Sequence, residues 1–173
     1  MKQSLVMRLV VAMFLSCMFI SCINDDDVVG RECVVGDRLP DFSVTMNDGS
    51  SVSGASLRES VSLILFFHTS CPDCQQVLPI IQRIYDEYAS ADIQFAFISR
   101  EEDAASIAAY WESQNFSMPY SAQSNRTVYE LFATSRIPRV YISDSKGIIR
   151  YIFTDNPVPT YEELKSAIDE QLL

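Results

Sequence analysis

The sequence contains a single histidine, His68, and far fewer basic than acidic residues. Lys and Arg number 13 against 23 Asp and Glu, which gives a formal net charge of −10. Such a surface repels phosphate backbones, so we expect no nucleic-acid partner and attribute the acidity to solubility. Internal repeats and low-complexity tracts are also absent. With 173 residues, 48% of them hydrophobic, the chain can form one domain with a real core.

The apolar run near the N-terminus is short. It covers residues 9–21 and is too short to span a bilayer comfortably. Lys2 and Arg8 precede it, and a basic start followed by a short apolar run is the pattern of a signal peptide. We therefore predict that residues 1–21 are a signal segment outside the fold.

This run ends in FISC, which resembles the lipobox of bacterial lipoproteins. The resemblance implies that Cys22 is lipidated and becomes the first mature residue, anchoring the protein to a membrane of the bacterial cell envelope. The site would face the periplasm or the outer surface. FLSC at Cys17 is the competing site, and an ordinary cleaved signal or an uncleaved anchor is the other alternative. The acidic run after Cys22 resembles a surface-export signal, or is a solvated tether.

Hydrophobic patterning predicts one α/β domain over residues 36–173, after a lipidated tether over 22–35. A mixed β-sheet covered by helices on both faces is expected, because strands alternate with helices and the chain ends in a β-hairpin and a helix. The expected elements are a hairpin around NDG (47–49), buried strands at 62–67 and 93–99, helices at about 72–89 and 125–133, and a hairpin around DSKG (144–147).

Two sequence stretches predict the starts of further helices. SREE (99–102) has the pattern of a capping box, with Ser99 as the N-cap and Glu102 reaching back to it. TYEE (160–163) repeats the pattern before the last helix. Pro79 lies inside the predicted helix 72–89, where proline is expected to produce a kink.

Cysteine spacing points to one pair. If Cys17 leaves with the signal and Cys22 carries lipid, then Cys33, Cys71 and Cys74 remain in an oxidising compartment. Only Cys71 and Cys74 have a motif spacing, CPDC, and they follow a buried strand and begin a helix. Unpaired amides and the helix dipole at such a site favour a thiolate at Cys71. Cys74, one turn on, could then attack a mixed disulfide. Cys33 is treated as incidental.

Three other interpretations of this pair are open: a zinc site, a copper carrier and a structural disulfide. A structural zinc site usually needs four ligands, and the chain offers one CxxC, a distant cysteine and one histidine. A copper carrier would need a wider cysteine spacing and a distal histidine. A static structural disulfide is the remaining alternative. We expect no metal and no cofactor beyond a redox-active Cys71–Cys74 disulfide.

The stretch GDRLPDF…NDG…LILFFHTSCPDC…P resembles the thioredoxin-like superfamily, nearest to exported, membrane-tethered thiol–disulfide oxidoreductases of the TlpA/ResA type. The resemblance covers about residues 36–173 and implies a thioredoxin-like fold. It implies Cys71 as nucleophile and Cys74 as resolving cysteine. Ile137 and Pro138 match the family's cis-proline loop, which presents backbone to an extended substrate chain.

The chain departs from the family at three helper positions. Ser70 stands where most members have Trp, and Leu65 and Val77 stand where thioredoxins and the TlpA/ResA group have an acidic residue. A buried carboxylate helps deprotonate the resolving thiol, so exchange is expected to be slower or to use another group.

His68 and Asp73 are the candidates for tuning the Cys71 thiol. A protonated His68 would stabilise a Cys71 thiolate, whereas the alternative is a partly buried histidine bonded to a backbone carbonyl. The charge of Asp73 would oppose the thiolate, and its alternative is a solvated loop residue.

The leading hypothesis is therefore a membrane-anchored thiol–disulfide oxidoreductase that exchanges disulfides with exported proteins. Ile137 before the proline resembles reducing members, and reduction in an oxidising compartment would need a membrane thiol electron donor. One alternative is a thioredoxin-fold peroxidase, because GDRLPDF is shared with that branch, although His68 occupies the place of its usual threonine. The other is a redox-inactive binding or structural lipoprotein with a permanent disulfide.

Overall fold

A computed structural model describes residues 32–173 of the chain. The predicted signal segment, Cys17, the predicted lipidation site Cys22 and the first ten residues of the predicted tether lie outside these described residues. Between residues 32 and 173, no helix is long and apolar enough to cross a membrane.

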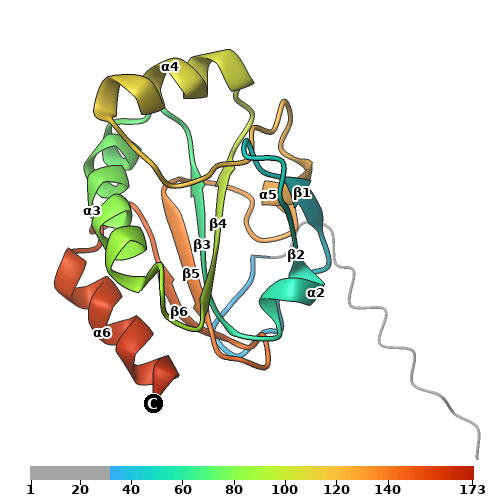
Figure 1. The fold of residues 1–173 in the computed structure, drawn as a ribbon. Helices are drawn as coiled ribbons and strands as arrows, with labels where there is room; N and C mark the ends of the chain where they lie inside the picture. Colours follow the sequence, from blue (N-terminus) through green and yellow to red (C-terminus); the bar gives the residue numbers. More distant parts are fainter. Residues whose placement is uncertain (1–31) are drawn as a thin grey trace, which may run out of the picture.

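A four-stranded mixed sheet forms the centre of the domain (Figure 1). Its spatial order is β4-β3-β5-β6, with β3 parallel to β4 and β5 antiparallel to both of its neighbours. All seven residues of β3 are buried, as expected for a central strand covered on both faces. The strands are β3 (Val61–Phe67), β4 (Ile93–Ser99), β5 (Arg139–Ser143) and β6 (Ile149–Phe153).

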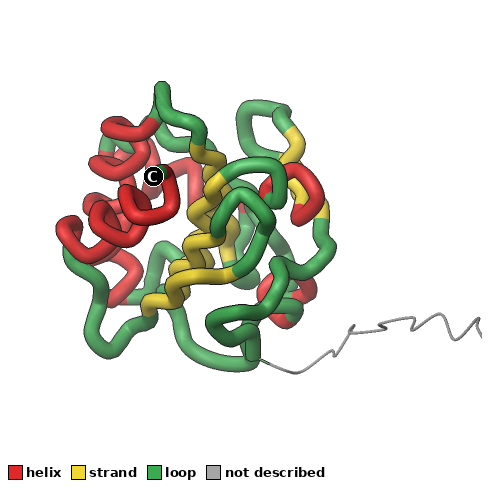
Figure 2. Tube along the Cα trace, turned by 90° about the horizontal axis from the view of Figure 1, so that it is seen from below, coloured by secondary structure: helices red, strands yellow, loops and turns green. Residues whose placement is uncertain are grey.

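Three helices cover one face and one end of this sheet. Helices α3 (Pro72–Tyr88) and α6 (Tyr161–Leu172) lie side by side against one face, and α4 (Ala104–Gln114) lies beyond the carboxyl ends of β3 and β4 (Figures 1 and 2). The ring of Trp111 in α4 packs against Phe67, with 5.0 Å between the centroids. Helix α4 therefore covers the end of β3 at which Cys71 follows.

The opposite face is covered by smaller elements: the β1 (Ser43–Thr45) and β2 (Ser51–Ser53) hairpin, α2 (Gly54–Leu57) and α5 (Thr127–Glu130). Because side chains alternate along a strand, Phe66 points to this face and Phe67 to the other. Phe66 packs against Phe132 at 5.0 Å and Tyr129 at 5.5 Å between ring centroids. The predicted mixed sheet with helices on both faces is confirmed, although the helices of this second face are single turns.

Two local predictions need correction. Helix α4 begins at Ala104 and its N-cap is Asp103, whose carboxylate accepts from Ser106 N at 2.9 Å, so the predicted capping box of Ser99 and Glu102 is wrong. The helix predicted over 125–133 shortens to Thr127–Glu130. The capping box at Thr160 and Glu163 is confirmed, as are the hairpins around NDG and DSKG.

Residues 32–35 lie against the domain. The backbone N–H of Cys33 donates to Phe132 O at 2.8 Å, and Glu32 Oε1 accepts from Arg139 Nη2 at 2.8 Å. Arg139 begins β5, so this segment is fastened next to the Ile137–Pro138 loop. The boundary between tether and domain at residue 36 stays a prediction.

The aromatic cluster around Phe66 makes a testable contribution to stability. Replacing Phe66 with Ala should lower the free energy of unfolding by about 3–5 kcal/mol, because it removes a fully buried ring and leaves a cavity. Urea denaturation of the full chain followed by circular dichroism measures this loss. Glu112→Ala, on the exposed side of α4, is the control and should change the value by less than about 0.5 kcal/mol. Equal effects of the two changes would contradict the described packing.

Candidate active site around Cys71 and Cys74

Cys71 is the N-cap residue of helix α3. Strand β3 ends at Phe67, and the backbone N–H of Cys71 donates to His68 O at 3.0 Å, closing a turn between strand and helix. Pro72 occupies the first helical position, where its missing N–H costs no hydrogen bond. The predicted place of Cys71 at a helix N-terminus is confirmed, and its side chain is partly exposed.

Cys74 lies one turn further on and is fully buried. Burial raises the pKa of its thiol well above the ordinary value, and the neighbouring Cys71 sulfur raises it further. The backbone N–H of His68, which bonds to the Cys74 sulfur, and the charge of Arg100 act in the opposite direction. The two cysteines are therefore unequal: Cys71 can be reached from solvent, whereas Cys74 is a protected thiol.

The loop before β5 faces Cys71. The Ile137–Pro138 peptide is cis, as the resemblance implies, and Cys71 Sγ lies 3.6 Å from the carbonyl oxygen of Ile137. These residues are 66 positions apart in the sequence. The antiparallel pairing of β3 with β5 brings the end of one strand to the start of the other, and so brings the cysteine and the proline loop together.

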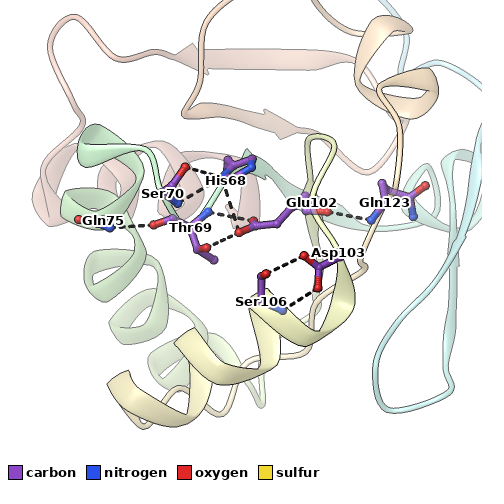
Figure 3. Close-up of polar contacts among 9 residues, drawn as sticks. His68, Thr69, Ser70, Gln75, Glu102, Asp103, Ser106 and Gln123 are labelled. Atoms are coloured by element: carbon purple, nitrogen blue, oxygen red, sulfur yellow. Dashed lines mark hydrogen bonds and ion pairs between the residues drawn. The ribbon is translucent and has the colours of Figure 1, made fainter.

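His68 lies in the turn between β3 and α3, with 29% of its side chain exposed. Its Nδ1 atom lies 2.9 Å from Ser70 Oγ, 3.2 Å from Ser70 N and 3.6 Å from Glu102 Oε1 (Figure 3). Serine, histidine and glutamate thus lie in a row, as in a hydrolytic triad. However, both contacts use the same ring nitrogen, so the ring cannot relay a proton from one neighbour to the other.

Glu102 and Thr69 are site residues that the sequence analysis missed. The Glu102 side chain, 4% exposed, accepts from Thr69 N at 2.9 Å and also from Thr69 Oγ1 (Figure 3). A usable signal was present, because Glu102 follows β4 and Thr69 follows β3. Carboxyl ends of neighbouring parallel strands meet at one edge of a sheet, so residues after both strands can touch.

The remaining predicted residues are placed as follows. Asp73 lies in the first turn of α3 and accepts from Gln76 Nε2 at 3.3 Å. Leu65 and Val77 are fully buried among apolar side chains, and Ser70 is exposed. In the part of the chain that the structure describes, no group of three or more His, Cys, Asp and Glu side chains is placed to hold a metal ion.

Known proteins of similar sequence include thiol–disulfide oxidoreductases. The chain is 25% identical over 136 residues to thioredoxin-like protein YneN of Bacillus subtilis, which covers 78% of each chain. It is 21% identical over 169 residues to thiol–disulfide oxidoreductase ResA of Geobacillus thermodenitrificans, covering 97% of this chain and 96% of ResA. The predicted relationship to ResA-type thiol–disulfide oxidoreductases is confirmed.

A solved structure extends the comparison to the fold. The crystal structure of a thiol:disulfide interchange protein of the thioredoxin family from Chlorobium tepidum superimposes with a TM-score of 0.69 at 20% identity. The match covers 83% of this chain and all of that one, so the fold is thioredoxin-like. The model of the AhpC/TSA family matches residues 35–152, which is more than half of the chain, and the chain therefore belongs to the AhpC/TSA family.

Proposed function

We propose that the chain is a thiol–disulfide oxidoreductase that uses Cys71 as nucleophile and Cys74 as resolving cysteine. The observation that carries this proposal is the position of Cys71. Cys71 is the N-cap residue of helix α3, and its partly exposed thiol lies 3.6 Å from the carbonyl oxygen of Ile137 in the cis-proline loop. A buried second thiol, Cys74, follows one turn later. Relatives named thiol–disulfide oxidoreductase support the same reaction.

The first step is attack by the Cys71 thiolate on a substrate disulfide. A bond forms between Cys71 Sγ and one substrate sulfur, the substrate S–S bond breaks, and the other substrate sulfur leaves as a thiolate. Unpaired amides at the start of α3 and the helix dipole stabilise the attacking charge.

The second step is attack by Cys74 on the mixed disulfide. Cys74 gives up its proton, a Cys71–Cys74 bond forms, and the second substrate sulfur leaves. The two cysteines are oxidised to a disulfide while the substrate disulfide is reduced to two thiols, so two electrons and two protons pass to the substrate. The reverse sequence oxidises a dithiol. Since burial raises the pKa of Cys74, its deprotonation is the demanding step.

The proline loop supplies a place for the substrate chain. Next to Cys71, the turn at Ile137 and Pro138 offers backbone groups to which an extended peptide can add. We infer that the partners are exported proteins carrying thiols or disulfides. Reduction would draw electrons from a membrane thiol donor, because the compartment is oxidising. His68 and Asp73 would tune the reactivity of Cys71.

Lipidation of Cys22 would hold this domain at a membrane of the bacterial cell envelope, facing the periplasm or the outer surface. The residues that support this are the basic start, the short apolar run and FISC. In this arrangement residues 1–21 are the signal segment, 22–35 the tether and 36–173 the catalytic domain.

Trapping of a mixed disulfide tests the reaction. Cys74→Ser should accumulate disulfide-linked partners on Cys71, because the resolving attack is removed while the first attack remains. Non-reducing electrophoresis of envelope fractions, followed by release with dithiothreitol, detects them. Cys71→Ser is the matched control and should trap none.

Two results would contradict the proposal. One is the absence of trapped partners together with a wild-type cysteine pair that resists dithiothreitol, the behaviour of a permanent structural disulfide. The other is rapid consumption of peroxide that depends on Cys71 alone, which would favour the peroxidase alternative carried by GDRLPDF (36–42).

The raised pKa of Cys74 predicts an alkaline reactivity profile. In a Cys71→Ser variant, alkylation of Cys74 by iodoacetamide should rise about tenfold per pH unit from pH 7 to pH 10, because only the thiolate reacts and burial keeps the thiol protonated. In urea the same profile should level off above the ordinary thiol pKa of about 8.5. Mass spectrometry of the Cys74 peptide measures both. A plateau below pH 9 in the folded protein would contradict the raised pKa.

Membrane association should depend on Cys22. Cys22→Ala in the full chain should move the protein from the membrane to the soluble fraction after cell lysis, because lipidation needs the thiol. Cys17→Ala, at the competing FLSC site, is the control and should leave association unchanged. Immunoblots of the two fractions give the answer, and release by the Cys17 change instead would assign the lipid to Cys17.

A further inference from the structure

The proposed reaction leaves one buried charge unexplained. Across residues 32–173, Glu102 is the only buried acidic residue, with 6% of the residue exposed. Burying a carboxylate is costly unless its oxygens are hydrogen-bonded. The partners of Glu102 therefore show what this carboxylate is placed to do.

Both oxygens of Glu102 accept hydrogen bonds from Thr69, and Oε1 also lies 3.6 Å from His68 Nδ1. The Thr69 backbone N–H donates to Oε2 at 2.9 Å, and the Thr69 hydroxyl donates to Oε1 (Figure 3). On the other side of the same residue, Gln75 Nε2 in the first turn of α3 donates to Thr69 O at 2.8 Å. Thr69 is thus held from both sides, by the β4–α4 loop and by helix α3.

Thr69 is the second residue of the turn, residues 68–71, that connects the two reactive cysteines to the sheet. This turn closes through the bond from Cys71 N to His68 O, and its first residue directs a backbone N–H at the Cys74 sulfur. Fixing Thr69 therefore fixes two things: the start of α3 at Cys71, and the amide that favours the Cys74 thiolate.

The loop that carries Glu102 is itself held in an uncommon shape. Glu101 has a φ of 62°, a left-handed conformation that a non-glycine residue adopts at an energetic cost. On either side of it, Arg100 N donates to Phe67 O at 2.7 Å and Glu102 N donates to Gln123 O at 2.8 Å. Backbone in this conformation persists only where the surrounding structure enforces it.

We propose that Glu102 is a positioning residue of the exchange reaction, and that it acts by holding Thr69, and through it the turn at residues 68–71, in the geometry that the resolving attack of Cys74 requires. The proposal rests on the function proposed above. It places a carboxylate at the active site of a chain whose residues 65 and 77 are apolar, but gives that carboxylate a different task, since its oxygens are engaged by Thr69.

A two-phase reaction separates the two cysteines. A chromogenic aryl disulfide added to the reduced full chain releases one coloured thiolate when Cys71 attacks it and a second when Cys74 resolves the mixed disulfide. Cys17, Cys22 and Cys33 are replaced by Ser in every variant so that only the pair reacts. Stopped-flow absorbance then gives a rate for each step.

Glu102→Ala should slow the second phase about tenfold and change the first by less than about twofold, the size expected for losing hydrogen bonds that serve one step. Glu102→Gln should retain most of the rate, because its amide can accept from Thr69 N and donate to Thr69 Oγ1. Asp103→Ala is the matched control. It removes the N-cap of α4 at the adjacent position without touching Thr69, and should leave both phases unchanged.

The outcomes are distinguishable. If the protein in which only Cys17, Cys22 and Cys33 are replaced gives no second phase, the proposed function is overturned. If that protein shows two phases and Glu102→Ala leaves the second phase unchanged, only the role of Glu102 is overturned. A Glu102→Gln variant as slow as Glu102→Ala would also overturn this role, because the charge of Glu102 would then carry the effect. If Glu102→Ala does not fold, Thr69→Val removes only the hydroxyl bond, and an unchanged second phase in that variant would overturn the proposal.

Discussion

The parallel pairing of β3 with β4 is the constraint on which the rest of the site depends. Because the two strands run in the same direction, Phe67 pairs with Ser99 and both chains leave the sheet at one edge. The turn that leads to Cys71 and the loop that carries Glu102 therefore start side by side. The antiparallel pairing of β3 with β5 brings Ile137 to the same edge from the other side. Three loops far apart in sequence meet there because of strand direction alone.

Much of this arrangement could be predicted from the sequence. The uniform apolar run of β3, the proline after Cys71 and the CPDC spacing are local signals, and each specifies one element or one helix end. The local sequence patterns did not predict the partner of Glu102, which follows instead from the parallel pairing of β3 with β4. The capping-box pattern at Ser99 and Glu102 is locally sound, yet Asp103 caps the helix one turn later and frees Glu102 for Thr69. Contacts between loops depend on sheet geometry, and local patterns do not encode it.

Cys71 and Cys74 lie in different environments, and this difference suits them to different steps of the proposed reaction. Cys71 is the partly exposed N-cap residue of α3, while Cys74 is buried where charge is disfavoured and the pKa of its thiol is raised. In the proposed reaction, this burial would slow the reaction of Cys74 with external reagents until a mixed disulfide forms next to it. The surrounding residues must then stabilise the Cys74 thiolate in place of solvent. The backbone amide of His68 and the charge of Arg100 act in this direction, because both lower the pKa of Cys74. The apolar side chains of Leu65 and Val77 add no charge to that interior.

The contact between Glu32 and Arg139 also sets a limit on where the enzyme can work. Glu32 is bonded to the domain beside the proline loop, so a tether from a lipid on Cys22 would extend over only ten residues before it reaches the domain. Fully extended, these reach at most about 35 Å. Glu32 lies beside the Ile137–Pro138 loop, so in the proposed arrangement the edge that carries Cys71 would stay close to the bilayer surface. A protein anchored in this way would act only on disulfides that come within a thin layer above the membrane.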